Sequence, residues 1–519
     1  MIARTVSCAV RGLGGVVVSV EADLANGLPA FTIVGLTDRA IQEARERVKA
    51  AVRNAGFDFP QRRLTVNLAP AEVPKEGTGF DLAIALAVIV CTGRALDLGE
   101  TAALGELALD ATVRPVTGVL PMARGLRAAG VRRLLVPVEN GPEAALVEGL
   151  EVVPVPTLQA CLRHLDGVEL LPGPRSAFAA TENGAVTDVA DVRGQETAKR
   201  ALEIAAAGGH NVLMLGPPGA GKTMLARALA SLLPDLTTEE SLEVAALYSL
   251  RGALRERAPT SLRPPFRAPH HSVSRAGLIG GGTGLAHPGE ISLAHRGVLL
   301  LDEACEFPRS LLEALRQPLE ERTVTVTRAR GSVTFPAAFT LVAAANPCPC
   351  GHLGDGTRPC TCDPRCLAAY QGRLSGPMRD RLDLCVSVPR QPFGVLFAED
   401  GVAGPTSAAV RHRIDAARRR QRERAAEMST EVTAPSRFSV AADSHLNAAL
   451  DGSALAIACR PLPAAVRLLA AAGERLGLSA RAFHRVLRVS RTIADLAGEE
   501  RVGEVAVAEA LRYRAEASG

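Results

Sequence analysis

Apolar and polar positions alternate in short blocks along the first third of the chain. Apolar runs at 15–22 and 64–69 are short and rich in β-branched residues, which predicts strands. Longer stretches at 40–55 and 82–91 have the length that is typical of helices. This alternation predicts one α+β unit over residues 1–165.

The pattern changes after this unit. Residues 166–188 contain Pro and Gly without sustained periodicity, which indicates an inter-domain linker. From 189 to 390, apolar strands are separated by helical and loop segments, as in a parallel sheet with crossover helices. These apolar strands end at Leu215, Leu301 and Ala345. A final helical portion covers 405–515, so the second half of the chain is predicted to be an α/β unit followed by helices.

A glycine-rich loop joins the first of those strands to a helical stretch, in the form of a Walker A motif. Such a loop turns backbone N–H groups toward a phosphate, its lysine reaches the β- and γ-phosphates, and its last hydroxyl holds Mg²⁺. A chance match in a glycine-rich chain is the alternative, which the flanking strand and helix disfavour. The loop consists of Gly216, Pro217, Pro218, Gly219, Ala220, Gly221, Lys222 and Thr223. The sequence therefore predicts binding of ATP with Mg²⁺.

Polar residues also end the next two apolar strands. Asp302 and Glu303 follow 297–301 and have the form of a Walker B motif, with Asp302 ordering Mg²⁺ and Glu303 activating the attacking water. Asn346 ends the strand 340–345, where its amide is suited to contact the γ-phosphate or that water, as a sensor 1 residue does. Each of these residues alone is equally compatible with a solvated strand end. Together with the Walker A loop they predict an ATP hydrolase.

Composition limits the other classes of function. The chain has 519 residues, 47% of them hydrophobic, and its net charge is only +4, so contacts with nucleic acid would need local basic patches. The longest apolar run, 82–91, is too short to cross a bilayer. A basic region followed by an apolar block is not found at the N-terminus. We therefore expect a cytoplasmic protein without a membrane partner.

Cysteines are concentrated in one loop. Of the 11 cysteines, five lie between 348 and 366, whereas the others are scattered singly. Four thiolates satisfy tetrahedral Zn²⁺, and a metal would staple a loop that has few apolar residues. Reduced free thiols and a redox-sensitive cluster remain alternatives, with Cys366 as a substitute ligand. The zinc candidates are Cys348, Cys350, Cys360 and Cys362.

Four further segments carry a resemblance to a known family. They are 191–211 (Asp-Val-Arg-Gly-Gln through Gly-His-Asn), 266–272 (Phe-Arg-Ala-Pro-His-His-Ser), 288–297 (Pro-Gly-Glu through His-Arg-Gly) and 346–351 (Asn-Pro-Cys-Pro-Cys-Gly). With the Walker motifs, they resemble the magnesium-chelatase-like AAA+ family, in particular its YifB/ComM branch, over essentially the whole chain.

This resemblance implies an AAA+ P-loop module with a C-terminal helical lid, working as a homo-oligomeric and usually hexameric ring. Arg381 matches the arginine finger that acts on a neighbouring subunit, and Arg379 is a competing candidate. Arg481 matches the sensor 2 arginine of the lid, although a surface arginine on a helix would look the same. Hydrolysis would then depend on assembly of the ring.

The N-terminal unit is similar to another family. Residues 72–90 and 104–130 resemble the peptidase domain of Lon, which implies a Lon-peptidase-like (ribosomal S5 domain 2-like) fold. A Ser–Lys dyad needs a hydroxyl and a nearby amine. The serine position falls on Gly79 and the lysine position on Leu120, so proteolysis is disfavoured, and binding of a partner or DNA, or support of the ring, is expected instead. Two stray candidates for the missing groups are Ser176 and Lys75.

Basic residues give candidate DNA contacts. The alternating segment 323–335 predicts a β-hairpin with Arg328 and Arg330 near its tip. In related AAA+ rings such a hairpin projects into the pore, where arginines grip phosphates, although an exposed turn with solvated arginines would have the same pattern. The run 411–424, with seven arginines, suits DNA, an acidic neighbouring subunit or a solvated helix face. For His270-His271 we expect loop packing or polar contacts and not a metal.

The leading interpretation is an AAA+ ATPase that moves along or remodels single-stranded or branched DNA. The resemblance implies helicase-like branch migration during recombination and DNA uptake. A second hypothesis is a chelatase-like or chaperone-like motor that remodels a partner protein. A third is an ATP-dependent switch or scaffold, which Glu303 and the finger candidate argue against.

Overall fold

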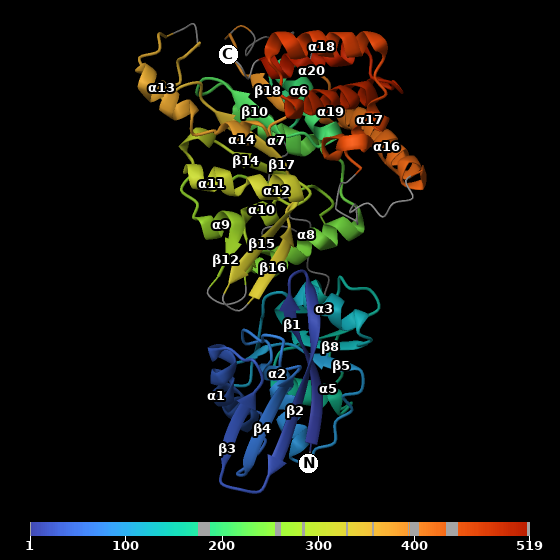
Figure 1. The fold of residues 1–519 in the computed structure, drawn as a ribbon. Helices are drawn as coiled ribbons and strands as arrows, with labels where there is room; N and C mark the ends of the chain where they lie inside the picture. Colours follow the sequence, from blue (N-terminus) through green and yellow to red (C-terminus); the bar gives the residue numbers. More distant parts are fainter. Residues whose placement is uncertain are drawn as a thin grey trace.

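The computed structural model describes two units placed end to end (Figure 1). The residues described are 2–174, 187–254, 261–282, 286–328, 331–354, 358–392, 394, 404–431 and 445–515. The N-terminal unit, in blue and cyan, lies below a larger unit that carries the remaining helices and a second sheet. None of the helices in the described part of the chain combines the length and apolar character needed to span a bilayer.

The N-terminal unit is built on a seven-stranded sheet of order β3-β4-β2-β1-β5-β8-β9. The pairs β1–β2 and β2–β4 are antiparallel, and the other neighbours are parallel. The strands are β1 (Ile2–Arg11), β2 (Gly14–Ala25), β3 (Ala30–Val34), β4 (Arg63–Ala69), β5 (Thr101–Ala103), β8 (Arg133–Pro137) and β9 (Glu151–Val155), with the small pair β6 (Glu106–Leu107) and β7 (Val113–Arg114). This mixed sheet confirms the predicted α+β character.

Helices cover this sheet according to their apolar residues. The helix α2 (Asp81–Cys91) is apolar on all sides and buried along almost its whole length, against β1, β2 and α1. The helix α1 (Arg39–Asn54) is amphipathic and begins at Asp38, whose side chain accepts from the backbone N–H of Ile41. The remaining helices are α3 (Val119–Ala128), α4 (Gly141–Ala144) and α5 (Leu158–Leu165).

The second unit contains a five-stranded parallel sheet of order β11-β14-β17-β10-β18. The strands are β11 (Phe266–Arg267), β14 (Val298–Leu301), β17 (Thr340–Ala345), β10 (Val212–Leu215) and β18 (Leu384–Ser387). β10 lies between two strands that come much later in the chain. The carboxyl ends of β10, β14 and β17 therefore meet at one edge, which is where ligands bind in open α/β sheets.

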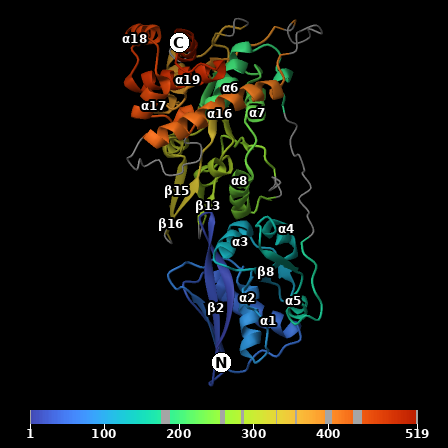
Figure 2. The ribbon, with the colours of Figure 1, turned by 90° about the vertical axis from the view of Figure 1, so that its right-hand side faces the viewer.

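Helices and small strands surround this sheet. They are α6 (Glu196–Gly208), α7 (Lys222–Leu232), α8 (Thr238–Arg251), α9 (Arg275–Ile279), β12 (Gly280–Gly281), β13 (His287–Pro288), α10 (Glu290–Leu293), α11 (Arg309–Ala314), α12 (Arg316–Glu321), α13 (Pro364–Gln371) and α14 (Gly376–Arg379). The expected hairpin is present as β15 (Thr323–Arg328) paired with β16 (Gly331–Pro336). It points toward the N-terminal unit in both views (Figures 1 and 2).

The C-terminal helices pack on the far side of this sheet from the N-terminal unit (Figure 1). They are α16 (Ser407–Glu431), α17 (Gly452–Cys459), α18 (Pro463–Leu476), α19 (Ala480–Ala497) and α20 (Glu504–Ala515). α16 and α19 contact α6, and α20 contacts β18. These contacts join the helical portion and the parallel sheet into one hydrophobic core.

The arginine-rich run of α16, for which DNA, an acidic neighbouring subunit or solvent was expected, has several partners within the chain. Arg418 donates to the carbonyl oxygen of Ala206 at 2.6 Å, near the C-terminus of α6. Arg424 forms an ion pair with buried Asp495 at 2.8 Å, and Arg413 one with Glu203 at 2.6 Å. Arginines suit helix C-termini because the last carbonyl groups have no partner within the helix. Most of this run therefore holds α16 to its neighbours.

The two units meet at α3 and α8 and at the turn between β1 and β2. The carboxylate of buried Glu143 accepts from the Leu120 backbone N–H at 2.9 Å and from the hydroxyl of Ser249 on α8. Gly12 in the β1–β2 turn lies against Thr334 of β16. The N-terminal unit thus contacts both α8 and the predicted DNA-binding hairpin.

Candidate functional site

The Walker A residues form a loop between β10 and the first turn of α7. Gly221 has φ +91°, a conformation that residues with a side chain rarely adopt. Gly216 lies so close to the next strand that an added Cβ would be 2.1 Å from the carbonyl oxygen of Val388. These two constraints explain the glycines at both ends of the loop.

Lys222 contacts three oxygen atoms around this loop. Its Nζ donates to the carbonyl oxygens of Gly216 at 2.7 Å and Pro217 at 2.9 Å, and to Oδ1 of Asn346 at 3.0 Å. The side chain is buried, and this desolvation lowers the pKa of the ammonium group. A buried cation held by neutral oxygens is a strong binding site for an anion such as a phosphate. The structure therefore brings the proposed sensor residue Asn346 directly to the Walker A lysine.

The Thr223 hydroxyl and the Asp302 carboxylate form the second contact of the site. Oγ1 of Thr223 donates to Oδ2 of Asp302 at 2.7 Å, which joins the start of α7 to the end of β14. A hydroxyl and a carboxylate are oxygen ligands of the kind that Mg²⁺ prefers. These two residues fit a magnesium ion beside the phosphate-binding loop.

Glu303 follows Asp302 and leaves the strand in an unusual backbone conformation. Its φ is +50°, which is rare for a residue other than Gly, and such conformations concentrate at functional sites. Its carboxylate is more than half exposed, and Nδ1 of His271 lies 3.8 Å from Oε2. The sequence predicted polar contacts for His271 but not this partner. The spacing of His271, four residues after β11 at the same sheet edge, is a signal that would have suggested it.

Two more side chains support the loop and were missed in the sequence. Nε2 of Gln195, a residue with φ +60°, donates to the carbonyl oxygens of Pro389 at 2.6 Å and Ala220 at 3.4 Å. Arg390 donates to the carbonyl oxygen of Pro218 at 3.4 Å. Both side chains donate to backbone carbonyl oxygens, and no sequence motif marks such contacts.

The structure places Arg381, the first arginine-finger candidate, at the opposite end of the sheet. The backbone carbonyl of Arg381 accepts from the Asn211 side chain at 3.0 Å, just before β10 begins, whereas Lys222 follows the end of β10. The Arg381 guanidinium contacts Glu320 and the carbonyl oxygen of Pro377. Arg379 turns inward and donates to the carbonyl oxygen of Gln371 at 3.0 Å. Neither guanidinium contacts the Walker A loop of its own chain.

Arg481 lies at the exposed start of α19. Its own carbonyl oxygen accepts from Arg485, and Arg485 is buried against Asp380 at 2.8 Å, beside the finger candidates. α19 is therefore anchored to the segment that carries Arg379 and Arg381. Among the described residues, no hydrogen bond or ion pair joins Arg481 to Lys222, so the sensor role of Arg481 stays a proposal.

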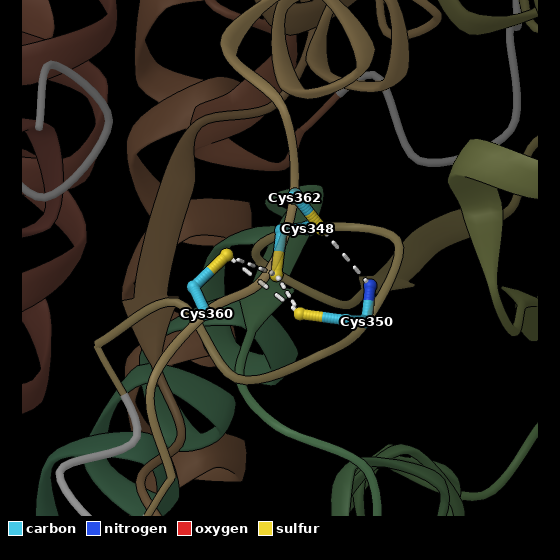
Figure 3. A group of neighbouring side chains, drawn as sticks. All are labelled: Cys348, Cys350, Cys360 and Cys362. Carbon is cyan, nitrogen blue, oxygen red and sulfur yellow. Dashed lines mark hydrogen bonds between the residues drawn. The ribbon is translucent and has the colours of Figure 1, made fainter.

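The four expected zinc ligands come together in one cluster (Figure 3). The sulfur atoms of Cys348, Cys350, Cys360 and Cys362 all lie within 4.8 Å of one another. Cys366 is exposed and is not part of this group. The cluster begins two residues after Asn346, so it lies next to the Walker A loop.

Of the DNA-contact candidates, Arg328 is exposed at the end of β15. Arg330 lies outside the described residues, as does Ser176. In the N-terminal unit, Leu120 is fully buried. Buried Lys75 donates to the carbonyl oxygen of Pro70.

Comparisons with known proteins agree with this arrangement. The family models "Magnesium chelatase, subunit ChlI", "Subunit ChlI of Mg-chelatase" and "Magnesium chelatase, subunit ChlI C-terminal" match residues 188–396, 20–140 and 404–514. The chain also has a partial similarity to Lon protease of Mycolicibacterium smegmatis, 29% identical over 160 residues, which cover 28% of this chain and 20% of that protein.

Similarity to two bacterial proteins extends over nearly the whole chain. Competence protein ComM of Haemophilus influenzae is 43% identical, covering 98% of this chain and 96% of its own length. Uncharacterized protein YifB of Escherichia coli is 41% identical with the same coverage. The chain therefore belongs to the magnesium-chelatase-like AAA+ family that includes ComM and YifB.

Proposed function

We propose that this protein is a ring-forming AAA+ ATPase that couples ATP hydrolysis to movement along DNA or to its remodelling. The observation that supports hydrolysis most directly is the convergence of Lys222, Thr223, Asp302 and Asn346 at the carboxyl ends of three parallel strands. Lys222 and Asn346 are 124 positions apart in the chain, and Thr223 and Asp302 are 79 apart. Phosphoryl transfer depends mainly on such positioning and on neutralising charge.

Each polar side chain of the site contributes to hydrolysis in this proposal. Lys222 binds the β- and γ-phosphates, and Asn346 holds the lysine and contacts the γ-phosphate or the attacking water. Glu303 orients that water and accepts its proton. When bound by Thr223 and Asp302, Mg²⁺ would neutralise charge on the phosphate oxygens. His271 restrains the Glu303 carboxylate on its exposed side.

The position of Arg381 supports assembly into a ring, with the hexamer as the expected form. The four residues of β10, at about 3.3 Å each, separate the backbone of Arg381 from the Walker A loop. A guanidinium at that end of the sheet is suited to the nucleotide of a neighbouring subunit. There it would stabilise the charge that develops on the transferred phosphoryl group.

DNA is the preferred substrate because of the β15–β16 hairpin. Its outward positions carry hydroxyls and a cation, with Thr325, Thr327 and Arg328 exposed on β15. Such a surface suits a phosphate backbone, whereas a polypeptide would favour an aromatic or aliphatic loop. The relative named a competence protein suggests branch migration, a helicase-like activity, in recombination and DNA uptake as the biological task.

Remodelling of a partner protein is the second candidate. The family descriptions that name a magnesium-chelatase subunit favour it, because they match most of this chain. The two candidates share the ATP site and differ in what the hairpin touches. A test of the hairpin therefore separates them.

Branch migration of a synthetic four-way junction, followed with labelled strands, tests the DNA proposal. Arg328→Glu should weaken DNA binding and migration strongly, and reduce the slope of log K against log salt by about 1. Arg422→Glu, which changes an exposed arginine on α16, is the matched control and should leave both unchanged. Equal behaviour of the two variants, or a wild type that separates no strands, would contradict the proposal and favour a protein substrate.

A further inference from the structure

We infer that Cys348, Cys350, Cys360 and Cys362 bind one structural zinc ion, and that the loop closed by this ion supports the Walker A loop through Gly351. The first part concerns the cysteines alone. The second part rests on the proposed nucleotide binding by the Walker A loop. Zinc content and nucleotide affinity are therefore measured separately.

The sulfur positions match a single tetrahedral ion. Zinc–sulfur bonds of 2.3 Å place the sulfur atoms of a tetrahedral site about 3.8 Å apart. In the structure, Sγ of Cys348 lies 3.3 Å from Sγ of Cys350 and 3.7 Å from Sγ of Cys360, and Cys350 and Cys360 are also 3.7 Å apart. A disulfide would bring two sulfur atoms to about 2.05 Å. The cluster thus has the spacing of a metal site and not that of two disulfides.

Backbone N–H groups also point at these sulfur atoms. The N–H of Leu353 donates to Sγ of Cys348 at 3.3 Å, and the N–H of Cys350 donates to Sγ of Cys362 at 3.4 Å. Such donors stabilise negative charge on the ligands and fix their orientation. The two N–H groups therefore lie where donors are expected around thiolates that bind a metal.

Packing alone does not explain why this loop holds its shape. Among the described residues from 347 to 363, only Cys348 and Gly351 are buried. Leu353 is 38% exposed. A segment with so little buried apolar surface gains little from the hydrophobic effect, and a bound ion supplies the missing stabilisation.

The same loop touches the nucleotide site. Gly351 has φ +80°, and a Cβ added to it would lie 2.5 Å from Cδ of Pro218 in the Walker A loop. Cys348 lies two residues after Asn346, which accepts from Lys222. The zinc ligands therefore fix both the segment that packs on Pro218 and the segment that carries Asn346.

The first measurement is elemental analysis of the full-length protein, purified under reducing conditions without a polyhistidine tag. One zinc per chain is expected. Cys360→Ser should reduce the zinc content to background, whereas Cys366→Ser, which changes the exposed cysteine outside the cluster, should retain it. Iron in place of zinc, no metal in the wild type, or full zinc occupancy in Cys360→Ser would overturn the metal site.

The second measurement is the affinity for a fluorescent ATP analogue with Mg²⁺, in two glycine variants that keep all four cysteines. Gly351→Ala should retain zinc but bind the analogue several-fold more weakly, because its Cβ displaces Pro218. Gly354→Ala is the matched control, since Gly354 also has positive φ, +75°, but no atom of the described residues lies within 4 Å of the added Cβ. Equal affinities of the two variants would overturn the coupling and leave the zinc site intact. A wild type that binds zinc but no analogue would instead refute the proposed nucleotide site.

Discussion

Each unit of the molecule buries a lysine, and the surroundings of the two lysines differ. Lys75 in the N-terminal unit is fully buried, and its Nζ donates to the carbonyl oxygen of Pro70. Lys222 in the second unit is also buried, but its Nζ reaches the Asn346 side chain at the end of a neighbouring strand. One lysine is held by a local turn, whereas the other lies where three segments that carry polar side chains converge.

The same contrast bears on the predicted resemblance of the N-terminal unit to the Lon peptidase. The positions expected to match the Ser–Lys dyad are Gly79 and Leu120, and Leu120 is buried at the junction with α8. We propose that the N-terminal unit supports the second unit and its hairpin and does not cleave peptides. Chemistry is then expected only in the second unit.

The largest effect is expected at Arg381. Arg381→Ala should reduce ATP hydrolysis by about 10³- to 10⁵-fold, because a trans-acting arginine stabilises the charge of the transferred phosphoryl group. Mixing this variant with Lys222→Ala should restore part of the rate, since each variant supplies the group that the other lacks. Steady-state hydrolysis of the separate and mixed proteins measures this. No recovery on mixing would mean that Arg381 does not act on a neighbouring subunit.

The next largest effect is expected from substitution of the two buried lysines. Lys222→Ala should lower ATP hydrolysis by about 10²- to 10³-fold without loss of folding, because it removes a preorganised charge from the site. Lys75→Met should instead leave hydrolysis unchanged and lower the free energy of unfolding by about 1–3 kcal/mol, because the carbonyl of Pro70 loses one of its two donors and keeps only the Val73 N–H. Hydrolysis rates and denaturant titrations of both variants test this. A loss of hydrolysis in Lys75→Met would contradict the proposed difference between the two lysines.

A smaller effect is expected at His271. His271→Ala should lower the rate of hydrolysis by about tenfold and leave ATP affinity unchanged, because the ring only restrains the Glu303 carboxylate. His270→Ala is a suitable control, since His270 contacts Ser272 instead of Glu303. If both variants lose the same activity, the histidines act through packing of the loop.

The smallest effect concerns the junction of the two units. Burial raises the pKa of Glu143 above its ordinary value of 4.5, although Ser249, Leu120 and Asn140 donate to its carboxylate. The folded state therefore holds this proton more tightly than the unfolded chain does, and stability is lost as pH rises from 4.5 through the raised pKa.

Glu143→Gln cannot ionise and should lose this pH dependence. The thermal midpoint of the wild type should fall relative to that of the variant as pH rises above 4.5. Differential scanning calorimetry measures both midpoints. Parallel curves would show that the junction does not respond to ionisation of Glu143.

Much of the nucleotide site was predictable because its parts follow apolar strands. Parallel strands share a carboxyl edge, so the loop after β10, the carboxylates after β14 and the amide after β17 were expected to meet. The structure brings Lys222, Asp302 and Asn346 together at that edge. The cysteine spacing likewise predicted the four residues that form the cluster.

Other contacts could not be predicted because their partners are backbone atoms or distant residues. Arg418 of α16 donates to the carbonyl oxygen of Ala206 in α6, and no residue type in the sequence marks this contact. Arg485, and not Arg481, is the α19 arginine that reaches the finger segment. Only the packing of the helical portion on the parallel sheet determines these pairs.

Steady-state ATP hydrolysis with no DNA, with single-stranded DNA and with a four-way junction determines whether DNA stimulates the ATPase. Glu303→Gln serves as the background, and its rate should be lower by about 10²- to 10⁴-fold. The account predicts that DNA raises the wild-type rate several-fold and leaves the variant inactive. A rate that depends on Glu303 but is the same with every DNA would contradict the DNA motor and favour a partner protein as the substrate.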